Sequence, residues 1–125
     1  MAGTVILVEE VASWYRGLEV DDPGSARSVA AAIDELEAEG PKLGRPLVDS
    51  ITGSSVRNVK ELRPGSTGRS EIRILFVFDP ARQAVLLVVG DKAGAWTGWY
   101  RENIPLAERR FAAWLAGEYA EERDF

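Results

Sequence analysis

The chain has 125 residues, 46% hydrophobic and 28% charged, a composition typical of one globular domain. It has no cysteine and no histidine, which excludes disulfides, thiolate metal sites and catalytic triads built on imidazole. No apolar run approaches the roughly 20 residues that span a bilayer, and the start MAGTVILVEE lacks the basic region of a signal peptide. We therefore expect a cytoplasmic protein without a membrane partner.

The net charge of −5 argues against indiscriminate binding to nucleic acid, but the charges are distributed unevenly. Residues 42–92 hold nine Lys or Arg against five acids, whereas the two flanks together hold 6 basic and 15 acidic residues. This segregation predicts one cationic surface on an acidic body. The alternative is that these charges only solvate the edges of strands.

The first third of the chain predicts one strand and two helices. Thr4–Val8 is a short continuous apolar run, typical of a buried strand. Apolar residues then recur at helical spacing over Glu9–Leu18 and again over Ser25–Glu39, and Gly40-Pro41 ends the second helix. Two helices joined by a short turn should pack as a hairpin on one face of a sheet.

The rest of the chain predicts three more strands and a last helix. Residues 42–55 have no period and should be irregular. The strands are expected, with tight turns between them, at Val56–Arg63, Arg69–Phe78 and Gln83–Gly90. Asn103 can cap the last helix, with Pro105 in its first turn.

The order βααβββα predicts an α+β domain over residues 1–125. Its sheet should be four-stranded and mostly antiparallel, with the helical hairpin and the C-terminal helix packed on it. The clearest strand is Glu71–Phe78, where every even position is large and apolar. Such alternation buries one face, so Arg73 should stand on the other face, where a rigid element presents it.

Several strings from residue 43 onward resemble one known family. They are LGRP at 43–46, KELRP at 60–64, GRSEIRILF at 68–76 and GDKAG at 90–94. Together they are similar to the HigB-like, phage-derived branch of the RelE/ParE toxin superfamily, over about residues 4–115. The element order given above is also the order expected for that superfamily.

The resemblance implies the toxin of a type II toxin–antitoxin system, made beside a helix-turn-helix antitoxin. RelE-like members cut mRNA in the ribosomal A site with Lys, Arg and Tyr side chains, and they use no metal and no other cofactor. ParE-like members share the fold but poison DNA gyrase. Fold alone does not choose between these activities.

Metal-free RNA cleavage needs a base for the 2′-OH, cations for the phosphorane-like charge and an acid for the leaving oxygen. Carried onto this sequence, the superfamily pattern makes Arg73 the phosphate clamp and transition-state stabiliser. Lys60 is the candidate base if neighbouring cations and partial burial lower its pKa. Lys92 or Tyr100 is the candidate acid.

A second set of residues is expected to bind RNA. It comprises Arg63 and Arg69, which would position the substrate, together with Arg57 and Trp96, whose ring could stack on a base. The structural alternative for Trp96 is to pin the last helix to the sheet. For Lys60, Arg63 and Arg73 the alternative is a set of salt bridges to Glu61, Glu71 and Asp91.

Two features depart from the family pattern. HigB-like relatives often carry histidines where this chain has Val56 and Arg57, and ribosome-dependent toxins tend to be basic, whereas this pI is near 4.8. Three functions therefore stay open. They are a ribosome-associated mRNA interferase, a ParE-type toxin acting on gyrase, and a weakly active toxin that mainly binds an antitoxin.

Overall fold

The computed structural model describes residues 4–65, 71–93 and 96–119, without the side chains of residues 96 and 97. Within these residues a short 3-10 helix (Gly40–Lys42) follows the second of three α-helices. The helices are α1 (Glu9–Asp21), α2 (Pro23–Glu39) and α3 (Trp96–Leu115). The strands are β1 (Val5–Leu7), β2 (Val48–Ser50), β3 (Lys60–Leu62), β4 (Ile72–Phe78) and β5 (Ala84–Asp91).

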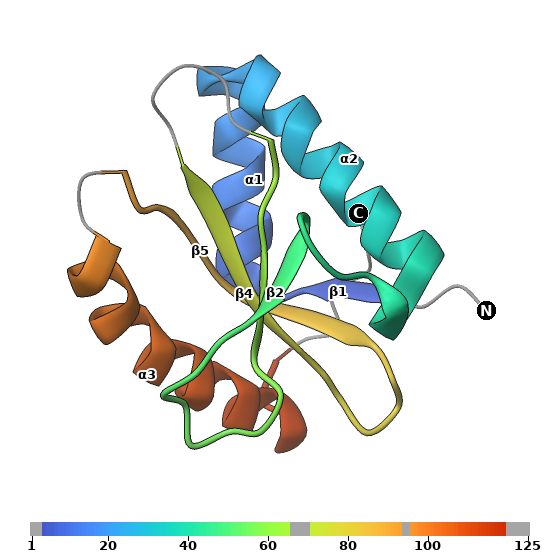
Figure 1. Ribbon diagram of the computed structural model, residues 1–125, viewed down its shortest axis with the longest axis vertical. Helices are drawn as coiled ribbons and strands as arrows, with labels where there is room; N and C mark the ends of the chain where they lie inside the picture. Colours follow the sequence, from blue (N-terminus) through green and yellow to red (C-terminus); the bar gives the residue numbers. More distant parts are fainter. Residues whose placement is uncertain (1–3, 66–70, 94–95, 120–125) are drawn as a thin grey trace.

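The strands form one sheet in the order β1-β5-β4-β3-β2. β1 runs parallel to β5, with Val5 opposite Ala84, and the other three pairs are antiparallel. The α1–α2 hairpin covers one face of the sheet and α3 covers the other (Figure 1). The predicted α+β class, the hairpin and the C-terminal helix are thus confirmed. None of the described helices is long and apolar enough to cross a bilayer.

The predicted number of strands was wrong, because the described sheet has a fifth strand, β2, inside the segment expected to be irregular. β2 is only three residues long and pairs antiparallel with β3, placing Asp49 opposite Glu61. Its sequence, Val-Asp-Ser, has little strand propensity of its own. This strand forms by pairing with β3, which comes later in the chain. The local sequence pattern of residues 48–50 does not predict that pairing.

The predicted start of the last helix was also wrong. α3 begins at Trp96, so Pro105 lies inside the helix and not in its first turn. Asn103 is not a cap: its side-chain amide donates to the carbonyl of Trp99, one turn earlier, at 2.8 Å. Gly98 and the Asn-x-Pro sequence read as breakers, yet packing of the helix against the sheet outweighs that local preference.

β4 and β5 form the centre of the core. Phe76, Leu75 and Leu86 are fully buried, and a β-bulge interrupts the pairing where Leu75 is opposite Val88 but Phe76 is opposite Leu86. The extra residue is Leu87. Its carbonyl accepts a hydrogen bond of 2.8 Å from Arg110 Nη1, so α3 satisfies the backbone group that the bulge displaces.

The close approach of α3 to Gly90 identifies the face on which the polar residues lie. A Cβ atom at Gly90 would stand 2.7 Å from Trp99 Nε1, so only glycine lets the indole lie this close to β5. Gly90 is opposite Arg73 in the β4–β5 pairing. Opposed residues share a face, so Arg73 lies on the α3 side, and the even positions of β4 face the hairpin.

Candidate functional site

Glu61 is the centre of a polar cluster on the α3 face of the sheet. Its side chain is fully buried although it lies in a strand one position from the sheet edge. One carboxylate oxygen, Oε1, accepts a hydrogen bond of 2.9 Å from Arg63 Nε and lies 3.9 Å from Arg73 Nε. The other, Oε2, accepts a hydrogen bond from the Tyr100 hydroxyl. The cluster therefore joins β3, β4 and α3.

Within the part of the chain that the structure describes, Arg73 is held in this cluster by one hydrogen bond and by nearby charges. Its Nη1 donates to its neighbour's backbone carbonyl, Ile72 O, at 2.9 Å, and Nη2 lies 3.8 Å from Glu71 Oε1. Its buried Nε has no hydrogen-bond partner within the described residues. An arginine presents five N–H donors. Arg73 is therefore fixed by the backbone and by nearby charges while retaining donors for an anion.

Lys92 follows β5 directly and is almost completely buried, with 2% of its side chain exposed. Its Nζ lies 3.9 Å from Glu71 Oε1 and 5.6 Å from the centre of the Tyr100 ring. Burial lowers the pKa of the Lys92 ammonium, and the nearby charge of Arg73 lowers it further. The side chain is thus a more ready proton donor than an exposed lysine.

Tyr100 lies in the first turns of α3, with its ring edge-on to that of Trp99 at a centroid distance of 5.1 Å. Burial raises the pKa of the Tyr100 hydroxyl to about 12, and its hydrogen bond to the Glu61 carboxylate and the charge of that carboxylate contribute. The hydroxyl is therefore protonated at neutral pH. It can donate a hydrogen bond or a proton but cannot act as a phenolate base.

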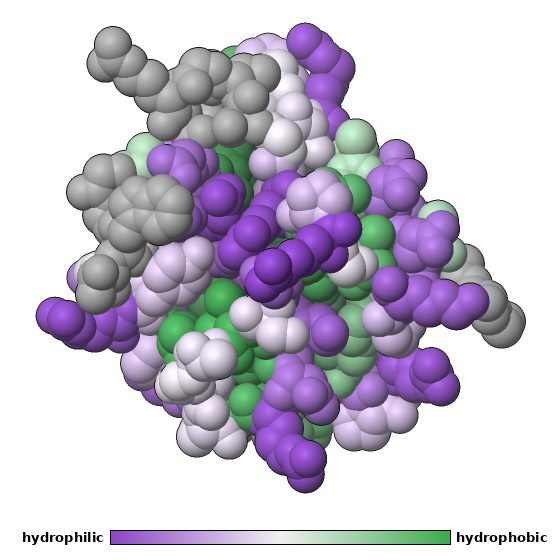
Figure 2. Space-filling view, in the orientation of Figure 1, coloured by the Kyte–Doolittle hydropathy of each residue, from purple (hydrophilic) through white to green (hydrophobic). Residues whose placement is uncertain are grey.

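The cations of the cluster are balanced by carboxylates. Arg63 also lies 3.3 Å from Asp49 Oδ2, so Arg63, Arg73 and Lys92 face Asp49, Glu61 and Glu71. The salt bridges considered as the alternative for Arg63 and Arg73 are thus present, although Asp91 instead accepts from the backbone N–H of Glu71. Hydrophilic side chains also gather in the middle of the view in Figure 2, which looks at the molecule from the side of the edge strand β2 (Figure 1).

The structure brings together four of the eight residues expected at the site: Arg63, Arg73, Lys92 and Tyr100. Lys60 is opposite Phe76, so it points to the hairpin side of the sheet, away from Glu61. Arg57 is exposed in the segment between β2 and β3. Arg69 lies outside the described residues, as does the side chain of Trp96.

Sequence reasoning treated Glu61 only as a salt-bridge partner and missed its place at the centre. The signal was available in KELR, because Glu61 and Arg63 are two residues apart on a strand and so share a face. Lys60 was grouped with Arg63 although an odd spacing puts the two on opposite faces. No group of three or more acidic side chains able to hold a metal ion occurs in the described parts of the chain.

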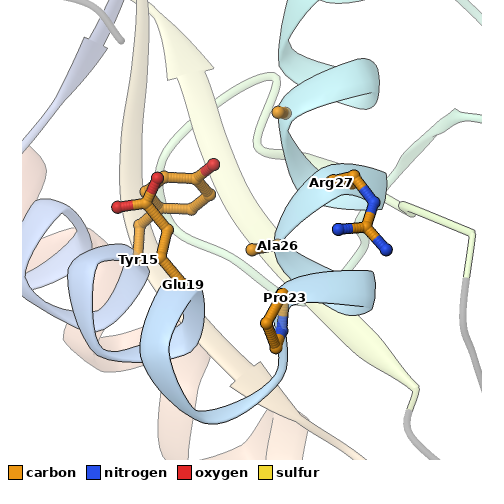
Figure 3. A pocket seen from close by; sticks show the side chains of 6 residues that line it. Tyr15, Glu19, Pro23, Ala26 and Arg27 are labelled. Atoms are coloured by element: carbon orange, nitrogen blue, oxygen red, sulfur yellow. The ribbon is translucent and has the colours of Figure 1, made fainter.

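A separate concavity lies between the two helices of the hairpin, on the other side of the molecule from the cluster. It has a volume of about 230 Å³ and is lined by Tyr15, Glu19, Pro23, Ala26, Arg27 and Ala30. Tyr15 and Glu19 come from α1, while the Arg27 guanidinium points away from both (Figure 3). This shallow groove holds no constellation of catalytic groups.

Comparison with known proteins places the chain in a family. The sequence model described as "Phage derived protein Gp49-like" matches residues 14–112. The chain belongs to this family. This Gp49-like chain is 57% identical over 109 residues to the Mycobacterium tuberculosis protein named "Putative toxin HigB2". It is 54% identical over 115 residues to the same organism's "Putative toxin HigB3". The expected membership of the HigB-like, phage-derived branch is confirmed.

The two relatives differ in how much of their length the match covers. It takes in 87% of this chain but 53% of HigB2, so the chain spans about half the length of that relative. For HigB3 it takes in 92% of this chain and 96% of the relative. No solved structure matches the chain significantly.

Proposed function

We propose that this Gp49-like protein is the toxin of a type II toxin–antitoxin pair and that it inhibits translation by cutting mRNA. The toxin assignment is supported by the names of the two relatives, each of which aligns with most of this chain. The RNA-cleaving activity is supported by the chemistry of the cluster. It would require no metal, because the cluster offers cationic and proton-donating side chains.

The observation that carries the proposal is the environment of the Arg73 guanidinium. This guanidinium is 15% exposed, is fixed on a central strand and has a buried Nε without a hydrogen-bond partner in the described structure. With Nε turned to Glu61, a phosphodiester entering the site would supply oxygens for the Nη donors of this guanidinium, and arginine can bind two oxygens at once. Charge that develops on phosphorus in the transition state would then meet preorganised donors.

Tyr100 and Lys92 supply the proton that the leaving 5′-oxygen needs. Tyr100 holds its proton at neutral pH because burial and Glu61 raise the pKa of its hydroxyl to about 12. An alkoxide leaving group is a much stronger base than a phenolate, so transfer from Tyr100 is favourable. Lys92, above the same ring, would stabilise the developing charge or share the role of acid. Lys60, on the opposite face, has no part in this mechanism, so the proton of the attacking 2′-OH would pass to solvent water or to the partly exposed carboxylate of Glu71.

The partners follow from the same proposal. A toxin of this kind requires a cognate antitoxin, here expected to be a helix-turn-helix protein, and its substrate is mRNA on the ribosome. The acidic body of the protein would be repelled by ribosomal RNA, so the α3 face with Arg63 and Arg73 is the surface that would face the RNA. Arg57, exposed on the segment before β3, would extend that surface.

The decisive experiment is primer extension on an mRNA in a reconstituted translation system. It compares the wild type with Arg73→Ala, in reactions with and without ribosomes and with EDTA. Wild-type cuts should persist in EDTA and vanish without ribosomes. Arg73→Ala should lower the cleavage rate by ~10²–10³-fold, the effect of losing one preorganised donor.

Arg109→Ala is the matched control, because Arg109 is an exposed arginine on α3. It should cut like the wild type. Cuts that survive Arg73→Ala unchanged would refute the role of Arg73 while leaving RNA cleavage intact. Intact mRNA in every lane with folded protein would refute the interferase, and damaged DNA in growth-arrested cells would then point to gyrase.

One observation favours a second candidate function. Three carboxylates offset the three cations of the cluster, so the site carries less positive field than its cations alone would give. A weakly active toxin retained for binding an antitoxin would show this balance. Such a protein would bind its antitoxin tightly and cut mRNA no faster than the Arg73→Ala variant.

A further inference from the structure

The Glu61 carboxylate is buried, although formation of β3 does not require a carboxylate at this position. An ionised carboxylate loses much of its hydration when it is fully buried, and this loss costs several kcal/mol unless partners replace the water. Glu61 is fully buried in the middle of a three-residue strand. An apolar residue of similar volume would fill this position without that cost.

Both oxygens of the Glu61 carboxylate are engaged, and each by a residue of the proposed site. Oε1 lies between Arg63 Nε and Arg73 Nε, at 2.9 and 3.9 Å, and Oε2 accepts from the Tyr100 hydroxyl. These three groups come from the end of β3, from β4 and from α3. No single element could hold them in register with one another.

We propose that Glu61 is the positioning residue of the site, a buried anion that holds Arg63, Arg73 and Tyr100 together before any substrate arrives. This inference rests on the proposed function, because the site that Glu61 would position is the proposed RNA-cleaving site. Without the carboxylate, two guanidinium groups would repel each other across the same face, and the Tyr100 hydroxyl would lose its hydrogen-bond acceptor. Glu61 does not touch the substrate, because the side chains it holds cover it.

This arrangement has a distinctive kinetic consequence. Replacing Glu61 by the isosteric, neutral Gln removes a negative charge from a place where a phosphate must bind. Substrate affinity should therefore be maintained or improved, so KM should stay level or fall. The geometry of Arg73 and Tyr100 would be lost, so kcat should fall by about 10²-fold. A smaller folded fraction alone would also lower the apparent kcat at constant KM, so the variants are compared at equal concentrations of folded protein, measured by circular dichroism.

The test compares wild type, Glu61→Gln, Glu61→Asp and Glu102→Gln in the ribosome-dependent cleavage assay. Glu102 is an exposed acid on α3 two residues after Tyr100, and its replacement should leave both constants unchanged. Glu61→Asp restores the charge on a shorter side chain and should recover part of kcat. A Glu61→Gln enzyme with wild-type kcat would overturn the proposal, as would a Glu61→Asp enzyme no better than Glu61→Gln.

A second readout needs no RNA and separates this inference from the proposed function. The ring carbon bearing the hydroxyl of Tyr100, labelled with ¹³C and assigned by loss of its signal in Tyr100→Phe, reports ionisation of that hydroxyl by NMR. Ionisation should move from about pH 12 towards the ordinary value of 10.0 in Glu61→Gln, while Tyr15 and Tyr119 do not change.

A failure of the proposed function and a failure of the positioning role of Glu61 therefore give different results. A wild type that cuts no RNA refutes the proposed function, and the NMR signal still decides whether Glu61 holds Tyr100. A Tyr100 signal that is the same in Glu61→Gln and wild type refutes the positioning role whatever the RNA shows. If Glu61→Gln does not fold, Glu61→Met, an apolar side chain of similar volume, carries both readouts, and an unmoved Tyr100 signal with wild-type kcat there overturns the proposal.

Discussion

The Tyr100 hydroxyl donates a hydrogen bond to the buried carboxylate of Glu61 and so ties the start of α3 to an inner strand of the sheet. The two residues are 39 positions apart in the chain. Neither residue is in a conventional catalytic motif. Their contact matters because it places a proton donor beside the arginine that is proposed to hold the phosphate.

Removing only the Tyr100 hydroxyl should disable the proposed chemistry without unfolding the protein. Tyr100→Phe keeps the ring against Trp99 and Lys92 but has no proton to give. We expect mRNA cleavage to slow by about 10²-fold or more, the usual contribution of a general acid. Tyr119→Phe is the matched control, because among the described residues that hydroxyl donates to the surface carboxylate of Glu10, away from the cluster. Equal rates for the two variants would exclude Tyr100 as the acid.

Lys92 should make stability depend on pH at the alkaline end. Because the pKa of folded Lys92 is below its ordinary value of 10.5, the unfolded chain binds the proton more tightly than the native protein. Stability therefore rises with pH between the lowered pKa and 10.5, by at most about 1.4 kcal/mol per pH unit.

Urea unfolding of wild type and Lys92→Met from pH 7.5 upward measures this effect, because the variant lacks the titrating group. The difference in unfolding free energy should shift in favour of the wild type as pH rises. A difference that is independent of pH would mean that Lys92 titrates alike in the folded and unfolded chains. The same variant should also cut mRNA more slowly.

Gly90 and Gly98 should respond oppositely to alanine. A Cβ at Gly90 would meet Trp99 Nε1 at 2.7 Å, and the buried indole has no room to retreat. Gly90→Ala should cost about 1–3 kcal/mol of stability, as overpacking does, and should displace Tyr100.

Gly98 is an exposed helical residue with open space around its Cβ position. Gly98→Ala should therefore stabilise by about 0.5–1 kcal/mol. Thermal unfolding of both variants gives the comparison, and equal melting temperatures would contradict it.

Glu108 should make the segment before β3 sensitive to acid. Its Oε2 accepts hydrogen bonds of 2.7 Å from both Ser54 Oγ and the Ser55 backbone N–H. The bond from Ser54 and then that from Ser55 lower the pKa of the Glu108 carboxyl below its ordinary 4.5. A lowered carboxyl pKa stabilises the native contact above pH 4.5 and loses that contribution as pH falls through the folded value.

Amide hydrogen exchange at Ser55 measures this contact. Protection should be lost on acidification before the sheet opens, and Glu108→Gln should already lack part of it at neutral pH. Glu102→Gln, on the same helix, should not change it. Protection of Ser55 that is insensitive to both pH and Glu108→Gln would show that other contacts hold the segment.

The fold was predictable wherever a pattern repeated within one element. The alternation of Ile72, Ile74 and Phe76 gave β4 and its orientation, and helical spacing gave the hairpin. β2 could not be found in this way, since Val48, Asp49 and Ser50 become a strand only by pairing with β3. The early start of α3 was hidden for a similar reason: burial of Trp99 against Gly90 outweighs the local preference of Gly98.

The cationic residues of the candidate site were predictable from the sequence, whereas its buried glutamate was not. Arg73, Lys92 and Tyr100 were named from the family resemblance, and the structure groups them. Glu61 escaped because a glutamate in a charged string is usually solvated. Only the sheet register and the helix above it show that this one is enclosed. Lys60 was named from the superfamily pattern of cations on successive strands, but its register opposite Phe76 turns it to the other face of the sheet.

The parallel pairing of β1 with β5 also bears on how the proposed toxin is synthesised. β1 reaches its partner only after about two thirds of the 125 residues have been synthesised, since Val5 lies opposite Ala84. Lys92 and Tyr100 come later still. A nascent chain on the ribosome therefore lacks both a closed sheet and an assembled cluster. If the proposed activity holds, the ribosome that makes the chain meets no assembled cluster until the residues up to Tyr100 have left its exit tunnel.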